Sequence, residues 1–377
     1  MRVLVTVQPA AGHLRSLVPL ATALRGAGHA VAVAAPPALH AEVGSYGLTA
    51  VAAGGGWSAA EAAAWAEVLR APERPWRWEE LYWHRLDAAR HTARDLLAIG
   101  PGWRPDLIVR DATEFGGAWA AERLGIPHVP VSTGGGLATL YAMPELAVRL
   151  DAHRRALGLP PDPGLAEPNR HRYVSLTPPA FDPAELTLPN ARAFRHRHAA
   201  RAGEALPAWL VDAAPGRPLV FASLGTAFSA APGRLEAIAA GLGRLDCAAV
   251  VACGSAPLSR PPANVRLVAS VPQPLVLRCA DLFVTHGGIN GIREALLLGV
   301  PMVVAPVATD QPRNALRCEA LGVARALPAG GVTAEAVAAA CTEVLGSPRF
   351  RERARAVQRS ALALPSLESL VAELERL

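Results

Sequence analysis

Short apolar runs alternate with amphipathic stretches along the first half of the chain. Gly, Pro or polar residues flank the apolar runs, which predicts buried strands. The stretches between them have the apolar spacing of helices with one buried face. Strands and helices in this alternation predict βα units of a parallel sheet. The predicted strands are 2–7, 30–35, 107–110 and 129–131, and the predicted helices are 14–26, ending near Gly26 and Gly28, and 117–124.

The same alternation starts again after residue 218. Between the two halves, residues 159–218 are rich in Pro, Arg and His and only weakly periodic, and 201–217 is the best candidate for a linker. Helices are expected again near the C-terminus. The predicted strands of this half are 219–222, 248–252, 265–269, 282–285 and 302–305, with a helix over about 233–243.

The chain has 377 residues, which is too long for one ordinary hydrophobic core, so two domains are expected. We assign 1–200 to an N-terminal domain, 201–217 to the linker and 218–377 to a C-terminal domain. The predicted fold class is α/β, with two doubly wound Rossmann-like domains facing each other across a cleft. Ligands of open α/β sheets bind beyond the carboxyl ends of the strands, so we expect the site in that cleft.

Composition narrows the class of protein further. No apolar run approaches the ~20 residues of a membrane helix. The apolar strand starts almost at Met1 and leaves no room for a leader, so we expect a cytoplasmic protein without membrane contact. The five cysteines are odd in number and lack metal-ligand spacing, which indicates free thiols. The net charge is only +5 and the arginines are scattered, which argues against a nucleic-acid partner.

An anion site is predicted where the apolar run 282–285 meets the next helix. His286, Gly287 and Gly288 form a small-residue turn, and the helix should begin near Asn290. Unpaired backbone N–H groups at such a turn point toward the helix entrance, where the helix dipole also favours negative charge. A phosphate group suits this position.

His13 is the candidate base of the first half. It follows Gly12 in the loop after the first strand and lies at the start of a helix, which disfavours the imidazolium form and keeps a neutral ring available. A neutral imidazole within hydrogen-bond reach can remove a proton from a hydroxyl group. The alternative interpretation is a helix-capping or surface histidine.

Asp111 is the candidate partner of His13, because it ends the strand 107–110 at the same edge of the sheet. A carboxylate that accepts one imidazole N–H fixes the tautomer and stabilises the imidazolium as it forms. In the alternative interpretation, Asp111 caps the helix that follows. Glu114 lies nearby but is less well placed.

Four segments together resemble the donor-binding signature of family 1 glycosyltransferases with the GT-B fold. The chain is most similar to bacterial natural-product members of antibiotic type, which move deoxysugars from dTDP or UDP. The loop 8–13 and the region 106–127 are also placed as in that family, so the resemblance covers most of the chain. The four segments are 270–273, 286–294, 299–301 and 310–311 with Asn314 and Ala315.

The resemblance implies a mechanism and a donor site. It implies an inverting transfer with His13 as general base and Asp111 as its partner, without cofactor or metal, and C-terminal helices that pack back on the N-terminal domain. It places the pyrophosphate at His286 and the following turn, the ribose at Glu294 and sugar hydroxyls at Asp310 and Gln311. The implied donor-binding residues are Gly12, Ser223, Gly225, Thr226, Ser270, Val271, Gln273, His286, Gly287, Gly288, Ile289, Asn290, Gly291, Glu294, Asp310 and Gln311.

Ser270 departs from the family pattern. Many members carry an aromatic residue there, commonly Trp, which stacks on the nucleotide base. A hydroxyl group offers no stacking surface, so dTDP and UDP both stay open as donors.

Aromatic residues gather in the segment after Gly54-Gly55-Gly56, and aromatic side chains on loops suit a flat, hydrophobic aglycone such as a polyketide or macrolide. Packing inside the N-terminal domain is the alternative for each of them. The glycines after residue 133 permit close backbone approach to a ligand. The candidate acceptor-binding residues are Trp57, Trp76, Trp78, Tyr82, Trp83, Gly134 and Gly135.

Two rival functions are disfavoured by the sequence. A nicotinamide oxidoreductase would carry Gly-x-Gly-x-x-Gly after the first strand, but the loop 8–13 reads Gln-Pro-Ala-Ala-Gly-His. A non-catalytic helper with the same fold is disfavoured because His13, Asp111 and His286 are all present. The expected partners are therefore a nucleotide sugar and a small hydrophobic aglycone, and the protein could be a monomer or a homodimer.

Overall fold

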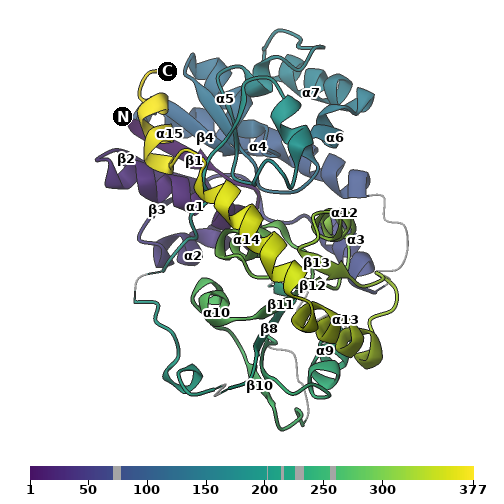
Figure 1. Cartoon of the computed structure of the whole chain (residues 1–377). Coiled ribbons are helices and arrows are strands. Elements are labelled where there is room, and N and C mark those ends of the chain that lie inside the picture. The colour runs from purple at the N-terminus through teal and green to yellow at the C-terminus, as the bar shows by residue number, and fades with distance from the viewer. Residues whose placement is uncertain (71–77, 202, 214–215, 226–232, 255–259) are drawn as a thin grey trace. The chain divides into compact units, whose positions relative to one another are not determined.

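The computed structural model describes the whole chain except residues 71–77, 202, 214–215, 226–232 and 255–259, and it divides into two compact units (Figure 1). The N-terminal unit consists of Met1–Trp65, Arg77–Ala202 and Leu364–Leu377. The C-terminal unit consists of Gly203–Ala363 together with Ala66–Trp76. The second unit therefore begins inside the predicted linker, and the end of the chain belongs to the first unit.

The N-terminal unit is built on a parallel sheet of seven strands in the order β3-β2-β1-β4-β5-β6-β7. Strands β1 and β4 are direct neighbours at the centre, so the loops that follow them meet at one edge of the sheet. The strands are β1 (Arg2–Thr6), β2 (Ala30–Ala35), β3 (Thr49–Ala52), β4 (Leu107–Asp111), β5 (His128–Val131), β6 (Tyr173–Ser175) and β7 (Ala191–Ala193).

The C-terminal unit repeats this design with six parallel strands in the order β10-β9-β8-β11-β12-β13. Here β8 and β11 are the central neighbours, and Thr285 at the end of β11 pairs with Ser223 at the end of β8. The strands are β8 (Leu219–Ser223), β9 (Ala248–Ala252), β10 (Val265–Val268), β11 (Leu282–Thr285), β12 (Met302–Val304) and β13 (Ala324–Ala326).

Helices connect the strands of both sheets. The α-helices are α1 (Ala11–Gly26), α2 (His40–Ser45), α3 (Ala59–Arg70), α4 (Trp78–Trp103), α5 (Gly116–Leu124), α6 (Leu137–Tyr141), α7 (Pro144–Ala156), α9 (Arg234–Leu242), α10 (Gln273–Cys279), α11 (Ile289–Leu298), α12 (Gln311–Ala320), α13 (Ala334–Gly346), α14 (Pro348–Leu362) and α15 (Leu367–Leu374). Short 3-10 helices cover Pro37–Leu39, Glu167–Asn169, Pro183–Thr187 and Ala208–Leu210. No helix in the described ranges has the length and apolar character needed to cross a bilayer.

The predicted doubly wound α/β class is confirmed for each unit, with two kinds of difference in detail. Helix α1 begins at Ala11 and not at residue 14, so His13 lies in its first turn. The strands β3 and β13 were not predicted. The sequence pattern also gave no sign of β6 and β7, which lie in the Pro-rich stretch 159–218. Each has only three residues, which is too short for a strand period to stand out.

The last helix belongs to the core of the N-terminal unit. Ser366 caps α15 by accepting a hydrogen bond from the backbone N–H of Ser369 at 3.3 Å. Four buried residues at helical spacing, Leu367, Leu370, Val371 and Leu374, join the apolar cluster that also contains residues of α1. Figure 1 shows α15 in yellow beside α1 in purple. By contrast, α14 packs against α11 in the C-terminal unit, so only α15 returns as the resemblance implies.

All five cysteines are free thiols, as expected from their spacing. Four are buried and Cys279 is exposed. Burial raises the pKa of the Cys341 thiol to about 12, so at neutral pH this side chain behaves as a small apolar group.

Candidate functional site

The structure brings His13 and Asp111 into direct contact in the N-terminal unit. His13 Nδ1 lies 2.6 Å from Asp111 Oδ2. The contact follows from topology, because β1 leads into the turn that carries His13 and its neighbour β4 ends at Asp111. The Asp111 side chain is 0% exposed, whereas that of His13 is 33% exposed. A buried carboxylate therefore supports an imidazole that solvent and ligands can reach.

Hydrogen bonds fix the orientation of the Asp111 carboxylate. The other oxygen, Oδ1, accepts from the backbone N–H and the hydroxyl of Thr113, both at 2.8 Å, and from the hydroxyl of Thr133 at 2.6 Å. Burial alone would raise the pKa of Asp111, but the charge of His13 and these hydrogen bonds lower it to about 2. Asp111 is therefore ionised throughout the neutral range, as the partner of a general base needs to be.

The alternative interpretation of Asp111 as a helix cap is wrong. Glu114 takes that position, because its carboxylate accepts from the first amides of α5, Gly116 N at 2.7 Å and Gly117 N at 2.8 Å. The same carboxylate accepts from the Thr6 hydroxyl at 2.8 Å, and burial raises its pKa. Glu114 is thus engaged in the structure of the loop and does not contact His13 as Asp111 does.

Thr113 and Thr133 were not among the predicted site residues, although both contact Asp111. Thr133 follows the strand β5, which is the neighbour of β4 in the sheet. Hydroxyl-bearing residues directly after an apolar strand were the available signal, because strands that neighbour β4 deliver their loops to Asp111. Buried Glu185 supports the same loop by accepting from the Ser132 hydroxyl at 2.8 Å.

Trp57 is a predicted acceptor residue that contacts the loop before His13. Its indole N–H donates to the carbonyl of Pro9 at 2.8 Å, four residues before His13, and its side chain is 40% exposed. The guanidinium of Arg85 stacks 4.5 Å from the centre of the indole and forms an ion pair with Glu61. An exposed aromatic surface therefore adjoins the loop that carries His13.

The other predicted acceptor residues differ from one another in their surroundings. Trp83 is partly buried against a local apolar cluster, with Arg149 4.6 Å above its ring, which fits the packing interpretation. Trp76 lies outside the described residues, and Trp78 and Tyr82 lie in α4 with side chains outside the described part. Gly134 has open space around its Cβ position, and Gly135 follows it in the loop after β5.

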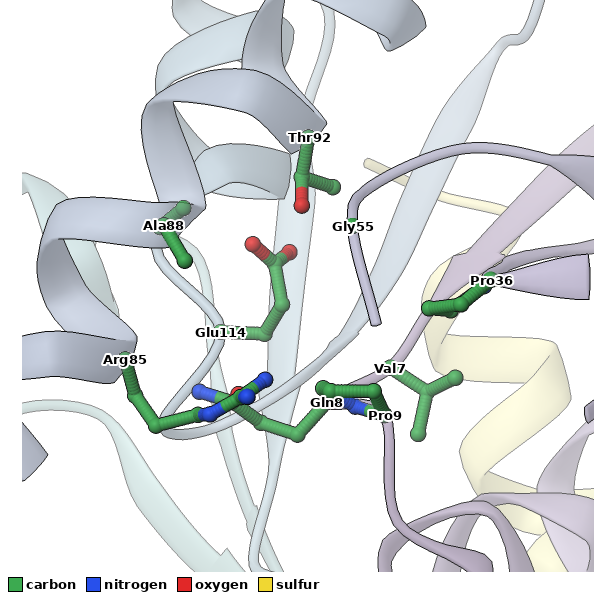
Figure 2. Close-up of a pocket in the computed structure, with 10 residues that line it drawn as sticks. Val7, Gln8, Pro9, Pro36, Gly55, Arg85, Ala88, Thr92 and Glu114 are labelled. Carbon is green, nitrogen blue, oxygen red and sulfur yellow. The ribbon is translucent and has the colours of Figure 1, made fainter. Parts of the chain in front are cut away.

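A small cavity lies beside the first loop of the N-terminal unit. Figure 2 shows the Arg85 guanidinium beside the Gln8 carboxamide, with the Glu114 carboxylate turned into the same space. Gly55 and Pro36 close the opposite wall. Arg85 is another residue that the sequence analysis missed, because nothing in a helical pattern marks one arginine among many.

The C-terminal unit places His286 between two glycines. A Cβ atom at Gly288 would lie 2.5 Å from Nε2 of the ring, and one at Gly225 would lie 2.8 Å from Cε1. Gly225 also has a φ of +69°, which side chains other than glycine rarely adopt. Because both positions are glycine, the imidazole has room to lie across the ends of β8 and β11.

Burial lowers the pKa of His286 to about 4, although the carboxylate of Asp310 and a hydrogen bond to Ser223 act in the opposite direction. The ring is therefore neutral at pH 7. Helix α11 begins directly afterwards at Ile289, one residue before the predicted start, and has no side-chain cap on its first amides. This is the arrangement that favours an anion.

The remaining predicted donor residues form two small groups. Gln273 donates to the buried carboxylate of Glu294 at 2.7 Å, so the resemblance and the structure place these two together. Asp310 accepts from the Asn314 amide at 2.9 Å, and that amide also donates to the Gly287 carbonyl at 3.0 Å. Asn314, which belongs to the signature segment without an assigned role, thus ties the Asp310 loop to the His286 turn.

The Gln311 side chain stabilises a loop of this unit. Its side-chain oxygen accepts from the backbone N–H groups of Val307 at 2.8 Å and Ala308 at 3.1 Å, so it shapes the loop in which Thr309 has a φ of +60°. Ser270 is exposed. Thr226 lies outside the described residues. The other predicted residues, Gly12, Val271, Ile289, Asn290 and Gly291, lie on the turns and helix starts already named.

Two Rossmann-like units, one with a His–Asp pair and one with a Gly-flanked histidine before an uncapped helix, define the class of GT-B glycosyltransferases. Family models agree with this class. The erythromycin biosynthesis protein CIII-like N-terminal domain matches residues 22–190, and the corresponding C-terminal domain matches residues 236–377. The chain belongs to this family of natural-product glycosyltransferases, and it is a glycosyltransferase.

Individual relatives match over nearly the whole chain. Tylactone mycaminosyltransferase of Streptomyces fradiae is 30% identical, over 100% of this chain and 92% of that protein. L-demethylnoviosyl transferase of Streptomyces niveus is 31% identical, over 94% of this chain and 92% of that protein. The solved structure of spinosyn rhamnosyltransferase SpnG complexed with thymidine diphosphate is 26% identical, covers 100% of both chains and gives a TM-score of 0.80.

Proposed function

We propose that this glycosyltransferase moves a deoxysugar from a dTDP-sugar to a hydroxyl group of a hydrophobic natural-product aglycone, with inversion at the anomeric carbon. The observation that carries the proposal is the contact of His13 with buried, ionised Asp111. The named activities of the relatives, which transfer deoxysugars such as mycaminose to tylactone, support this substrate class.

In the proposed mechanism, His13 is the general base. The Asp111 carboxylate accepts from Nδ1, so Nδ1 carries the hydrogen and the lone pair lies on Nε2. Nε2 takes the proton of the acceptor hydroxyl while the hydroxyl oxygen attacks the anomeric carbon, and the bond from that carbon to the diphosphate oxygen breaks. Asp111 stabilises the imidazolium as it forms. A single displacement of this kind inverts the configuration.

The leaving diphosphate is assigned to the His286 turn. The backbone amides at the start of α11 are donors that stabilise negative charge as it develops, and the His286 ring lies against the same turn. With these donors in place, we propose that transfer needs no divalent metal. Turnover in excess EDTA should then equal turnover with added Mg²⁺, and a loss in EDTA would contradict the proposal.

The choice of dTDP over UDP rests on the relatives, because a solved neighbour holds thymidine diphosphate and Ser270 provides no aromatic surface that would decide the base. Thermal shift with dTDP and UDP tests this choice, since a ligand that binds only the native state raises its melting temperature. We expect the larger shift with dTDP, and an equal or larger shift with UDP would overturn the choice.

Transfer itself is tested by incubating the protein with dTDP-sugars and a panel of macrolide and aromatic polyketide aglycones. Mass spectrometry of the products should show one added deoxysugar, and NMR coupling at the anomeric position should show inversion. Retained configuration would refute the single displacement. Binding of dTDP without any glycoside from the panel would contradict the proposed substrate class.

A further inference from the structure

Arg110 is a charged residue in the centre of the N-terminal sheet, and its side chain is fully buried. It precedes Asp111 on β4. Its Nε lies 3.4 Å from Nδ1 of His128, whose pKa falls well below its usual value because of burial and the charge of Arg110. A neutral His128 can therefore accept from the guanidinium.

The other donors of Arg110 are bound to backbone carbonyls, three of them in the Asp111 loop and one at Pro168. One terminal nitrogen donates to the carbonyls of Asp111 at 3.2 Å, Ala112 at 3.0 Å and Glu114 at 3.3 Å. The second donates to the carbonyl of Pro168 at 2.6 Å. Three carbonyls of one tight turn thus converge on a single cationic group.

Burial of a guanidinium is costly, because the charge loses its hydration. An apolar side chain would serve the packing of a central strand at this position without that cost. Three of the carbonyls that Arg110 holds belong to the loop next to the dyad, so this loop is one part of the chain that the buried charge organises.

The geometry of one peptide bond connects Arg110 to the dyad. In a planar trans peptide the C=O and the N–H point in opposite directions. Arg110 holds the carbonyl of Ala112, so the N–H of the same peptide, which belongs to Thr113, points the other way. That N–H donates to Asp111 Oδ1 at 2.8 Å. The cation at the carbonyl also polarises the peptide and strengthens this hydrogen bond.

We propose that Arg110 is a positioning residue for transfer: it fixes the Ala112–Thr113 peptide so that the Asp111 carboxylate stays aimed at Nδ1 of His13. The proposal rests on the proposed role of the His13–Asp111 dyad. It concerns orientation, so it applies to whichever sugar and aglycone the enzyme takes.

The test is a double-mutant cycle between Arg110→Lys and Asp111→Asn. Lysine keeps the charge but lacks the planar fork that reaches several carbonyls at once. Misplacement of a catalytic group by a fraction of an ångström to 1 Å costs up to about 100-fold, so Arg110→Lys should lower kcat by about 10- to 100-fold. If Arg110 acts through Asp111, the same change in the Asp111→Asn background should lower kcat by less than about threefold.

Arg154→Lys is the matched control. Arg154 is also buried in the N-terminal unit and donates to the Pro160 carbonyl at 2.8 Å and to Glu122 at 2.6 Å, away from the dyad. Its effect on kcat should be small and equal in both backgrounds. Equal losses from Arg110→Lys in both backgrounds would overturn the proposal, because they would show a merely structural role.

A second measurement does not depend on turnover. The proton between His13 Nδ1 and Asp111 should give a downfield NMR resonance, assigned by its loss in His13→Ala. In Arg110→Lys the resonance should broaden or move upfield, while in Arg154→Lys it should stay. An unchanged resonance in a folded Arg110→Lys protein would refute the positioning role. Unchanged turnover in Asp111→Asn would instead refute the proposed function and leave the NMR result to decide on Arg110.

Discussion

At the edge of the first sheet, a buried carboxylate holds the key histidine, and side chains and amides from two further loops hold that carboxylate. At the corresponding edge of the second sheet, the key histidine lies between Gly225 and Gly288, where the absence of side chains makes room for it. Both histidines follow a central strand, yet their chemistry differs. His13 is paired with a full negative charge, whereas burial keeps His286 neutral.

In the proposed mechanism, one sheet architecture prepares a histidine for two tasks. A base needs a partner that stabilises its protonated form, so it needs a specific charged neighbour. A group that receives a diphosphate needs space and unpaired donors, so it needs small residues and a helix start. Changes to charge should therefore affect the first site most, and changes to volume should affect the second.

The largest effect is expected for His13→Ala. Removing a general base typically costs about 10²- to 10⁴-fold, so kcat should fall in that range while the Kd for dTDP, measured by calorimetry, stays the same. His153→Ala is the control, because His153 also forms a histidine–carboxylate pair, with Asp87 at 3.0 Å, but on helices away from the sheet edge. Unchanged turnover in His13→Ala would end the assignment of the base.

A smaller effect, of volume and not of charge, is expected for Gly288→Ala. The new methyl group would lie 2.5 Å from His286 Nε2, so the ring or the turn has to move. Overpacking of this kind costs about 1–3 kcal/mol, which is about 5- to 150-fold in the Kd for dTDP if the ring binds the diphosphate.

Gly331→Ala is the control for this change, because nothing lies within 4 Å of a Cβ atom there. Equal affinities for dTDP in the Gly288→Ala and Gly331→Ala proteins would show that the His286 turn is not the diphosphate site.

The smallest effect is the pH dependence of dTDP binding. His286 is neutral above pH about 4 in the free protein, and a bound diphosphate adds negative charge that favours the imidazolium. Binding should then take up a proton, so the affinity should rise by a few fold as the pH falls from 7.5 toward 5.5. In the His286→Asn protein the residue cannot take up a proton. The pH dependence of its affinity for dTDP therefore gives the contribution of the diphosphate's own titration. Identical pH slopes in both proteins would exclude proton uptake by His286.

Much of the fold followed from the sequence because the strands around the site are long and apolar. The start of α11 was predicted within one residue, since the small-residue turn after β11 leaves few options for the backbone. The meeting of His13 and Asp111 also followed from sequence, because adjacent parallel strands deliver their loops to one edge. Hydrophobic patterns locate the strands along the chain, whereas the structure supplies their order in each sheet.

Competition between neighbouring polar side chains could not be predicted in the same way. Asp111 and Glu114 are both suited to cap α5, and only the turn between them decides that Glu114 reaches the helix amides. Likewise, Gln311 was expected to bind sugar hydroxyls, but its reach to two loop amides depends on backbone torsions that a sequence does not display. Arg110 has no periodic signature at all.

The packing of α15 has a consequence for how the protein is made. Domains generally fold as units, starting from the N-terminus during synthesis. The apolar cluster around α1 nevertheless includes residues 367–374, which the ribosome makes after the whole C-terminal unit. The N-terminal unit is therefore synthesised first, but its hydrophobic core is completed last. Until then it exposes the apolar face that α15 later covers.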